Sequence, residues 1–91
     1  MKKHYDIEIY GKVQGVGFRY SCMQEAREIG LKGFVKNRPD GSVYIEAEGE
    51  DFQLERLIQW CKDGPSHAKV NRVEKNESKL ENYSEFKIWR M

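Results

Sequence analysis

Three glycines and an arginine stand close together in the segment GKVQGVGFRY, residues 11–20. Gly15 and Gly17 would let the backbone close around an anion without clashes from Cβ atoms. A helix that begins directly after such a loop adds unpaired N–H groups and the positive end of its dipole. Arg19 supplies a planar, permanently charged guanidinium group that matches two phosphate oxygens. The segment from Gly15 to Arg19 is therefore a candidate phosphate-binding loop.

The loop alone does not decide between two interpretations. It lacks the Gly-Lys-Ser/Thr ending of a nucleotide P-loop, and a dinucleotide-binding fingerprint would need a third glycine at Tyr20. An ordinary strand-to-helix turn, with a solvated arginine, explains the same glycines as well as an anion site does. The surrounding elements must therefore show what the loop faces.

Apolar residues alternate from Tyr5 to Val13, which predicts a half-buried strand leading into the loop. A helix is indicated next by apolar residues at helical spacing: Phe18, Cys22, Ala26 and Ile29. Gly30 suits the left-handed residue that ends a helix. A start at Phe18 is favoured over a capping box at Ser21, and it places Arg19 in the first turn.

The remaining chain predicts two further strands, a second helix and two final strands. The strands at 31–37 and 43–49 are joined by the turn sequence RPDGS. A helix begins after Glu50 or Asp51 and is ended by Gly64 and Pro65. A fourth strand follows at 68–76, then a polar connection at 75–82 and a short strand at 84–90.

This order of elements predicts an α+β fold, the ferredoxin-like βαββαβ sandwich, with an antiparallel sheet and two helices on one face. In that topology the first two strands run parallel with the third between them, so their carboxyl ends lie at the same edge. Asn37, the last residue of the second strand, should therefore lie beside the glycine loop.

Length and charge limit the classes of function. The 91 residues are enough for a single domain, residues 1–91. A net charge of +1 provides no global field for nucleic acid or an anionic membrane, and no apolar run is long enough to span one. Stacking of RNA bases on exposed tyrosines is disfavoured because Glu46 and Glu48 share the sheet face of Tyr44. We expect a cytoplasmic monomer that acts on a small molecule.

The cysteines and histidines indicate no catalytic or metal site. Cys22 and Cys61 match no metal or redox spacing and lie on apolar helix faces, so buried free thiols are favoured, with a disulfide as the minor alternative. His4 lies far from the glycine loop and His67 follows the second helix, and both are expected at the surface. The sequence predicts no metal ion or organic cofactor.

Several motifs in order resemble the acylphosphatase family. They are GKVQGVGFR, GLKGFVKN, DGSV, WCKDGP, AKV and YSEFKI, which together span nearly the whole chain. The resemblance implies a hydrolase that acts on acid anhydrides and needs no cofactor. It also implies that Arg19 and Asn37 are catalytic, with Asn37 orienting the attacking water. The residues that would cradle the phosphoryl group are Gly15, Val16, Gly17, Phe18 and Arg19.

Acyl phosphate hydrolysis also accounts for the lack of a nucleophile–base pair in the sequence. The leaving carboxylate has a conjugate acid with a pKa of roughly 4 and needs no general acid. Phosphoryl transfer mainly requires positioning of the reactants and neutralisation of charge. The alternative is a non-catalytic phosphate-binding module of the same fold; Asn37 and a chain ending at Met91 favour the free-standing enzyme.

Overall fold

The strands and helices follow one another along the chain in the predicted order. The computed structural model describes residues 1–90. Its elements are β1 (Lys2–Lys12), α1 (Phe18–Ile29), β2 (Lys32–Asn37), β3 (Val43–Glu50), α2 (Asp51–Asp63), β4 (Lys69–Ser78) and β5 (Phe86–Ile88). α1 begins at Phe18 and is followed by Gly30 in the left-handed conformation, as predicted. α2 is capped by Glu50, whose side chain and that of Gln53 form a capping box.

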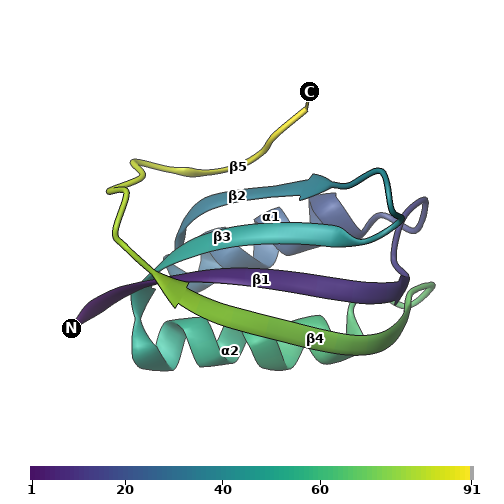
Figure 1. The fold of residues 1–91 in the computed structure, drawn as a ribbon, viewed down its shortest axis with the longest axis horizontal. Coiled ribbons are helices and arrows are strands. Elements are labelled where there is room, and N and C mark those ends of the chain that lie inside the picture. Colours follow the sequence, from purple (N-terminus) through teal and green to yellow (C-terminus); the bar gives the residue numbers. More distant parts are fainter. Residues whose placement is uncertain (91) are drawn as a thin grey trace.

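The strands form one sheet in the order β4-β1-β3-β2-β5. β1 pairs antiparallel with β3, and β3 pairs antiparallel with β2, so β1 and β2 run parallel on either side of β3. β5 joins β2 in parallel, which makes the complete sheet mixed. Both helices cover the same face of the sheet (Figure 1). The predicted ferredoxin-like arrangement is confirmed.

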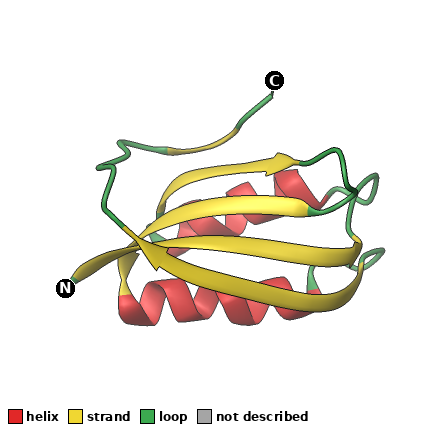
Figure 2. Cartoon of the chain, in the orientation of Figure 1, coloured by secondary structure: helices red, strands yellow, loops and turns green. Residues whose placement is uncertain are grey.

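The loops that follow β1 and β2 gather at the same end of the sheet (Figure 2). This follows from the parallel directions of the two strands, whose carboxyl ends point the same way. The glycine loop and the end of β2 are therefore neighbours, although β3 lies between their strands.

Apolar side chains fill the space between the sheet and the helices. The sheet contributes Ile7, Ile9, Val35, Val43, Ile45 and Ala47, and the helices contribute Phe18, Cys22, Ala26, Leu54, Leu57, Ile58 and Cys61. Removing each large aliphatic side chain from water stabilises the fold by about 1.5–3 kcal/mol. Both cysteines are buried and free, as predicted, and burial raises the pKa of the Cys22 thiol.

The two final strands differ in length from the prediction. β4 continues to Ser78, beyond the predicted end at residue 76, because Glu77 and Ser78 pair with Tyr5 and His4 of β1; these two residues were predicted to belong only to the polar connection. Their pattern lacks inward apolar residues, since this part of the edge strand is exposed on both faces. β5 covers three residues instead of 84–90, although Trp89 still donates its backbone N–H to the carbonyl of Val35.

The prediction that His4 lies at the surface is wrong. His4 is 2% exposed on the sheet face opposite the helices, because the chain between β4 and β5 passes over it. It belongs to a group that we call the outer-face cluster: His4, Asp6, Tyr44, Glu46, Glu48 and Tyr83. His67 is exposed, as expected.

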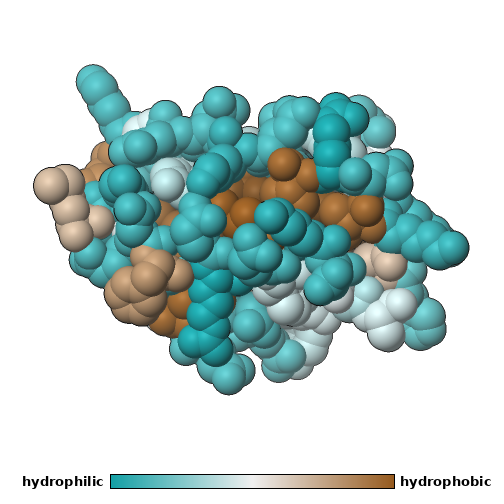
Figure 3. Space-filling view, turned by 90° about the horizontal axis from the view of Figure 1, so that it is seen from below, coloured by the Kyte–Doolittle hydropathy of each residue, from teal (hydrophilic) through white to brown (hydrophobic). Residues whose placement is uncertain are grey.

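Figure 3 shows the side of the molecule where α2 and β4 lie. Hydrophilic side chains cover much of this face, and a band of apolar atoms is visible among these side chains. None of the helices in residues 1–90 is long and apolar enough to cross a membrane.

Candidate functional site

The loop between β1 and α1 reverses direction through two glycines. Gly15 and Gly17 have φ angles of 73° and 78°, in the left-handed region that favours glycine. A Cβ atom at either position would meet nothing within 4 Å, so backbone conformation, not space, selects glycine here.

The start of α1 is not capped by any side chain. Gly17 occupies the N-cap position, and no acidic residue lies in the first turn. The first helical hydrogen bond runs from the N–H of Ser21 to the carbonyl of Gly17, at 3.1 Å. Among residues 1–90 no acceptor meets the N–H groups of residues 18–20, so the helix dipole and its donors are available to an anion.

The loop is held in place by the apolar side chains of Val16 and Phe18. Phe18 is buried and packs edge-to-face against Trp60, with ring centroids 5.3 Å apart. Val16 packs against the core and does not line the cavity described below. Apolar anchors thus alternate with Gly15, Gly17 and Arg19, which face the sheet end.

Gln14 ties the loop to the hairpin between β2 and β3. Its Nε2 donates to the carbonyl oxygens of Arg38 and Ser42, at 2.8 and 2.9 Å. Arg38 is held in turn by an ion pair with Glu8 at 2.8 Å. Two elements that are distant in sequence are therefore fixed relative to one another before any ligand binds.

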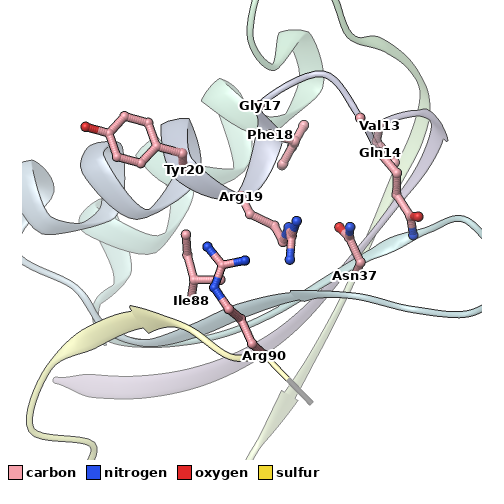
Figure 4. Close-up of a pocket in the computed structure, with 10 residues that line it drawn as sticks. Val13, Gln14, Gly17, Phe18, Arg19, Tyr20, Asn37, Ile88 and Arg90 are labelled. Carbon is pink, nitrogen blue, oxygen red and sulfur yellow. The ribbon is translucent and has the colours of Figure 1, made fainter.

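A cavity of about 140 Å³ lies between the loop, the end of β2 and the end of β5. We call it the loop cavity; its lining residues are Val13, Gln14, Gly15, Gly17, Phe18, Arg19, Tyr20, Asn37, Ile88 and Arg90. None of these is acidic, and two are arginines. Figure 4 shows the guanidinium groups of Arg19 and Arg90 and the amide of Asn37 directed into the same space.

Asn37 presents an oxygen without a partner. Its Oδ1 is buried and has no hydrogen-bond donor among the described residues. Asn37 and Val35 lie on the same face of β2 by strand alternation, so the amide points toward the helix side. Leaving a buried acceptor unpaired costs about 1–3 kcal/mol, and a bound water or ligand would recover that cost.

Most of the residues named from the sequence meet at this cavity. Arg19 and Asn37 lie together with Gly15, Gly17 and Phe18, whereas the partly buried side chain of Val16 packs against the core. Sequence reasoning missed Gln14 and Arg90. Gln14 could have been suspected as the polar residue that precedes the first loop glycine. Arg90 could not have been suspected from the sequence, because it reaches the cavity only through the pairing of β5 with β2.

Another group of side chains has its potential ligand atoms close enough together to be considered for a metal ion. Ligand atoms of His4, Asp6 and Glu46 lie within 4.8 Å of one another in the described part of the chain. However, His4 Nδ1 meets Glu48 at 2.7 Å and its Nε2 meets Asp6 at 2.9 Å. Both nitrogens must donate to these carboxylates, so the ring is an imidazolium without a free lone pair for a metal.

Electrostatics in the outer-face cluster agree with this charged state. Burial acts to lower the pKa of His4, but hydrogen bonds with Glu48 and Asp6 outweigh burial and raise it above the ordinary value. Burial acts to raise the pKa of Glu48, but hydrogen bonds from the backbone N–H of Glu81, from His4 and from the N–H of Tyr83 lower it. His4 and Glu48 are thus both ionised and paired with each other.

Comparison with known proteins gives a consistent result. The family model described as Acylphosphatase matches residues 5–88. A protein from Archaeoglobus fulgidus named acylphosphatase is 50% identical over 90% of this chain and 94% of its own, and one from Mannheimia succiniciproducens is 55% identical over 85% and 83%. The crystal structure of acylphosphatase from Bacillus subtilis superimposes with a TM-score of 0.94, at 42% identity, covering 99% of this chain and all of that one.

The same fold also occurs inside a longer protein. A structure of full-length HypF, in the phosphate- and nucleotide-bound form, matches 99% of this chain with a TM-score of 0.88 and 33% identity. The match covers 12% of the HypF chain. The match with the Bacillus subtilis acylphosphatase covers both chains almost completely, whereas the match with HypF covers only one part of a larger molecule.

Proposed function

The chain belongs to the acylphosphatase family, and we propose that its loop cavity hydrolyses the carboxyl–phosphate bond of acyl phosphates by direct attack of water. The single observation that carries this mechanism is that, among residues 1–90, neither Oδ1 of Asn37 nor the guanidinium of Arg19 in the same cavity has a polar partner. One group can hold water and the other can hold the phosphoryl group. The products are a carboxylate and inorganic phosphate.

Binding of the phosphoryl group is assigned to the loop and the start of α1. The N–H groups from Gly15 to Arg19 donate to its oxygens, and Arg19 contacts two of them with its planar fork. Side chains at Val16 and Phe18 contribute only by anchoring this backbone in the core. These donors are in place before the reaction, so little reorganisation is needed as charge develops on the equatorial oxygens.

Asn37 positions the nucleophile. Its Oδ1 accepts a hydrogen bond from water and aligns the water oxygen with phosphorus. A neutral amide does this without adding negative charge beside a dianion. The water oxygen forms the new P–O bond, the bond to the acyl oxygen breaks, and the electron pair leaves with the carboxylate. The water proton ends on the phosphate product or in solvent.

No general acid is needed for the leaving group. The carboxylate that departs is the base of an acid with a pKa of roughly 4, so it leaves without protonation. Among the described residues, the lining of the loop cavity contains no carboxylate that could serve as a general base. Positioning and charge neutralisation therefore provide the catalysis.

Further properties belong to the same proposal. We expect residues 1–91 to act as one catalytic domain, as a monomer in the cytoplasm, on a small acyl phosphate. The match with the Archaeoglobus fulgidus protein, which is named acylphosphatase, supports an enzyme over a non-catalytic module. Sedimentation of the purified protein would test the oligomeric state against the chain mass of 10.8 kDa.

Asn37→Ala tests the mechanism. We expect kcat for benzoyl phosphate to fall roughly 10²-fold, the scale for losing one preorganised group, while the Kd for inorganic phosphate stays within about twofold. Asn76→Ala, on the exposed edge strand, is the matched control and should keep wild-type turnover. Near-wild-type kcat in Asn37→Ala would refute the water-positioning role. Phosphate binding without turnover in the wild-type protein would instead select the non-catalytic module.

A further inference from the structure

A second hollow adjoins the loop cavity at the edge of the sheet. Its volume is about 320 Å³, and it is lined by Arg19, Lys36, Asn37, Trp89 and Arg90. It shares Arg19, Asn37 and Arg90 with the loop cavity. A substrate whose phosphoryl group occupies the loop cavity can therefore extend into this adjoining hollow without leaving the surface.

Three of the five residues that line the adjoining hollow are cationic, and none is acidic. Within residues 1–90, no carboxylate lies within ion-pair distance of Arg19, Lys36 or Arg90, whereas Arg38 and Arg72 have carboxylate partners. Like charges held close together destabilise one another unless an anion lies between them. One phosphoryl group is served by Arg19 and the loop N–H groups, which leaves Lys36 and Arg90 for another anion.

The hollow is built on a fixed wall. Trp89 packs edge-to-face on Phe34, with centroids 4.6 Å apart, and its backbone N–H bonds to Val35. Lys36 Nζ lies 4.8 Å from the centre of the Trp89 ring. The position of Trp89 sets that of Arg90, whose guanidinium turns toward Arg19 over the cavity (Figure 4).

We propose that Arg90 and Lys36 form a subsite for the acyl part of the substrate, and that it selects acyl phosphates whose acyl group carries a second negative charge, such as a carboxylate. This inference rests on the proposed function, because it takes the phosphoryl group to lie in the loop cavity. Arg90 binds the distal carboxylate, Lys36 adds a second positive charge, and Trp89 packs against the carbon skeleton. The anion on the acyl group is not a reacting atom, so the subsite sets specificity.

A matched pair of substrates tests the subsite. Benzoyl phosphate and 4-carboxybenzoyl phosphate differ by one carboxylate, which the rigid ring holds away from the phosphoryl group. For the wild-type protein at pH 7 we expect a higher kcat/KM with the carboxylated substrate. In Arg90→Gln this preference should fall roughly 10-fold, the scale of one charge-assisted hydrogen bond, because kcat/KM should fall more for the carboxylated substrate than for benzoyl phosphate. Arg90→Lys should recover part of it.

Lys87→Gln is the matched control, because it removes one positive charge from β5, shortly before Arg90 in the chain and outside both hollows. It should leave the preference unchanged at 0.15 M salt, where charges beyond about 8 Å are screened. An equal loss for both substrates in Arg90→Gln would overturn the subsite and place Arg90 on the phosphoryl group. Absence of any wild-type preference would also overturn it.

Binding separates this inference from the proposed function. Benzylphosphonate and 4-carboxybenzylphosphonate are not hydrolysed, so their Kd values report the subsite without turnover. Tighter binding of the carboxylated compound, lost in Arg90→Gln, would support the subsite even in a protein that hydrolyses neither acyl phosphate. Failure of hydrolysis alone would count against the proposed function, whereas equal Kd values would count against the subsite.

Discussion

The loop cavity and the outer-face cluster lie on opposite faces of the same sheet and treat polar groups in opposite ways. In the cluster, Glu48 accepts from two backbone N–H groups and pairs with His4, and Glu46 accepts from two tyrosine hydroxyls. In the cavity, Arg19 and Arg90 have no ion-pair partner among residues 1–90, and Asn37 Oδ1 has no donor.

The difference separates stability from function. A buried charge with its partners in place is costly to disturb, because removing one partner leaves the others unsatisfied. A polar group left without a partner contributes little to stability, but it is ready to bind a ligand. Substitutions on the two faces should therefore affect different measurements.

The largest effect is expected at Arg19. In Arg19→Ala, kcat/KM for benzoyl phosphate should fall by roughly 10²–10³, the scale for removing one group that stabilises developing charge. Arg19→Lys should also lose most activity, because a point charge cannot form the two-pronged contact. The free energy of unfolding in urea should change by no more than about 0.5 kcal/mol. A large loss of stability in Arg19→Ala would remove the distinction between the two faces.

Glu48→Ala should give the opposite result. It leaves the N–H groups of Glu81 and Tyr83 without their acceptor and His4 without its buried partner. We expect a loss of about 3–5 kcal/mol in the free energy of unfolding, while kcat/KM for benzoyl phosphate stays near the wild-type value where the protein is folded. Glu77→Ala on the exposed strand is the control. Wild-type stability in Glu48→Ala would show that the cluster contributes nothing.

The pH dependence of stability sharpens the same comparison. The raised pKa of His4 means that its stabilisation is full below the ordinary value of 6.5 and is lost as pH rises through the folded pKa. The lowered pKa of Glu48 means that its stabilisation is full above the ordinary value of 4.5 and is lost as pH falls through the folded pKa. The free energy of unfolding in urea should therefore include the full contributions of both His4 and Glu48 between about pH 4.5 and 6.5.

His4→Gln isolates the alkaline side of this profile. The variant should be less stable than the wild type near pH 6, and the difference should shrink as the pH rises past the folded pKa of His4. A difference that stays constant from pH 6 to 10 would contradict a charged His4.

The smallest effect is expected at Gly17. Gly17→Ala keeps a left-handed φ of 78° that costs about 1 kcal/mol for a residue with a Cβ atom. Gly41→Ala in the β2–β3 turn is the matched control, since its φ is 93° and a Cβ there also meets nothing within 4 Å. Both variants should lose similar stability, whereas kcat/KM should fall in Gly17→Ala alone. Equal kcat/KM values in Gly17→Ala and Gly41→Ala would show that catalysis does not depend on the conformation of this loop.

Local signals in the sequence were sufficient for most of the fold. Gly30 and Gly64 mark the helix ends, and the order of strands predicts the position of Asn37 beside the glycine loop. These features depend on backbone conformation and on the direction of strands, which short patterns encode.

The features that the sequence did not reveal depend on contacts between distant segments. His4 is buried because residues near Glu81 and Tyr83 cross the outer face, and Arg90 reaches the cavity because β5 pairs in parallel with β2. A three-residue strand carries too few alternations to predict its partner or direction.

The order of strands also leaves the sheet with two open edges, at β4 and β5. Unpaired strand edges invite other chains to add to the sheet, which leads to aggregation. β4 is the longer edge, and it bears charges of both signs: Lys69, Arg72, Glu74, Lys75 and Glu77. β5 offers three residues, with a lysine at the centre. Both edges therefore resist the addition of a further strand, which favours a protein that stays dispersed at high concentration.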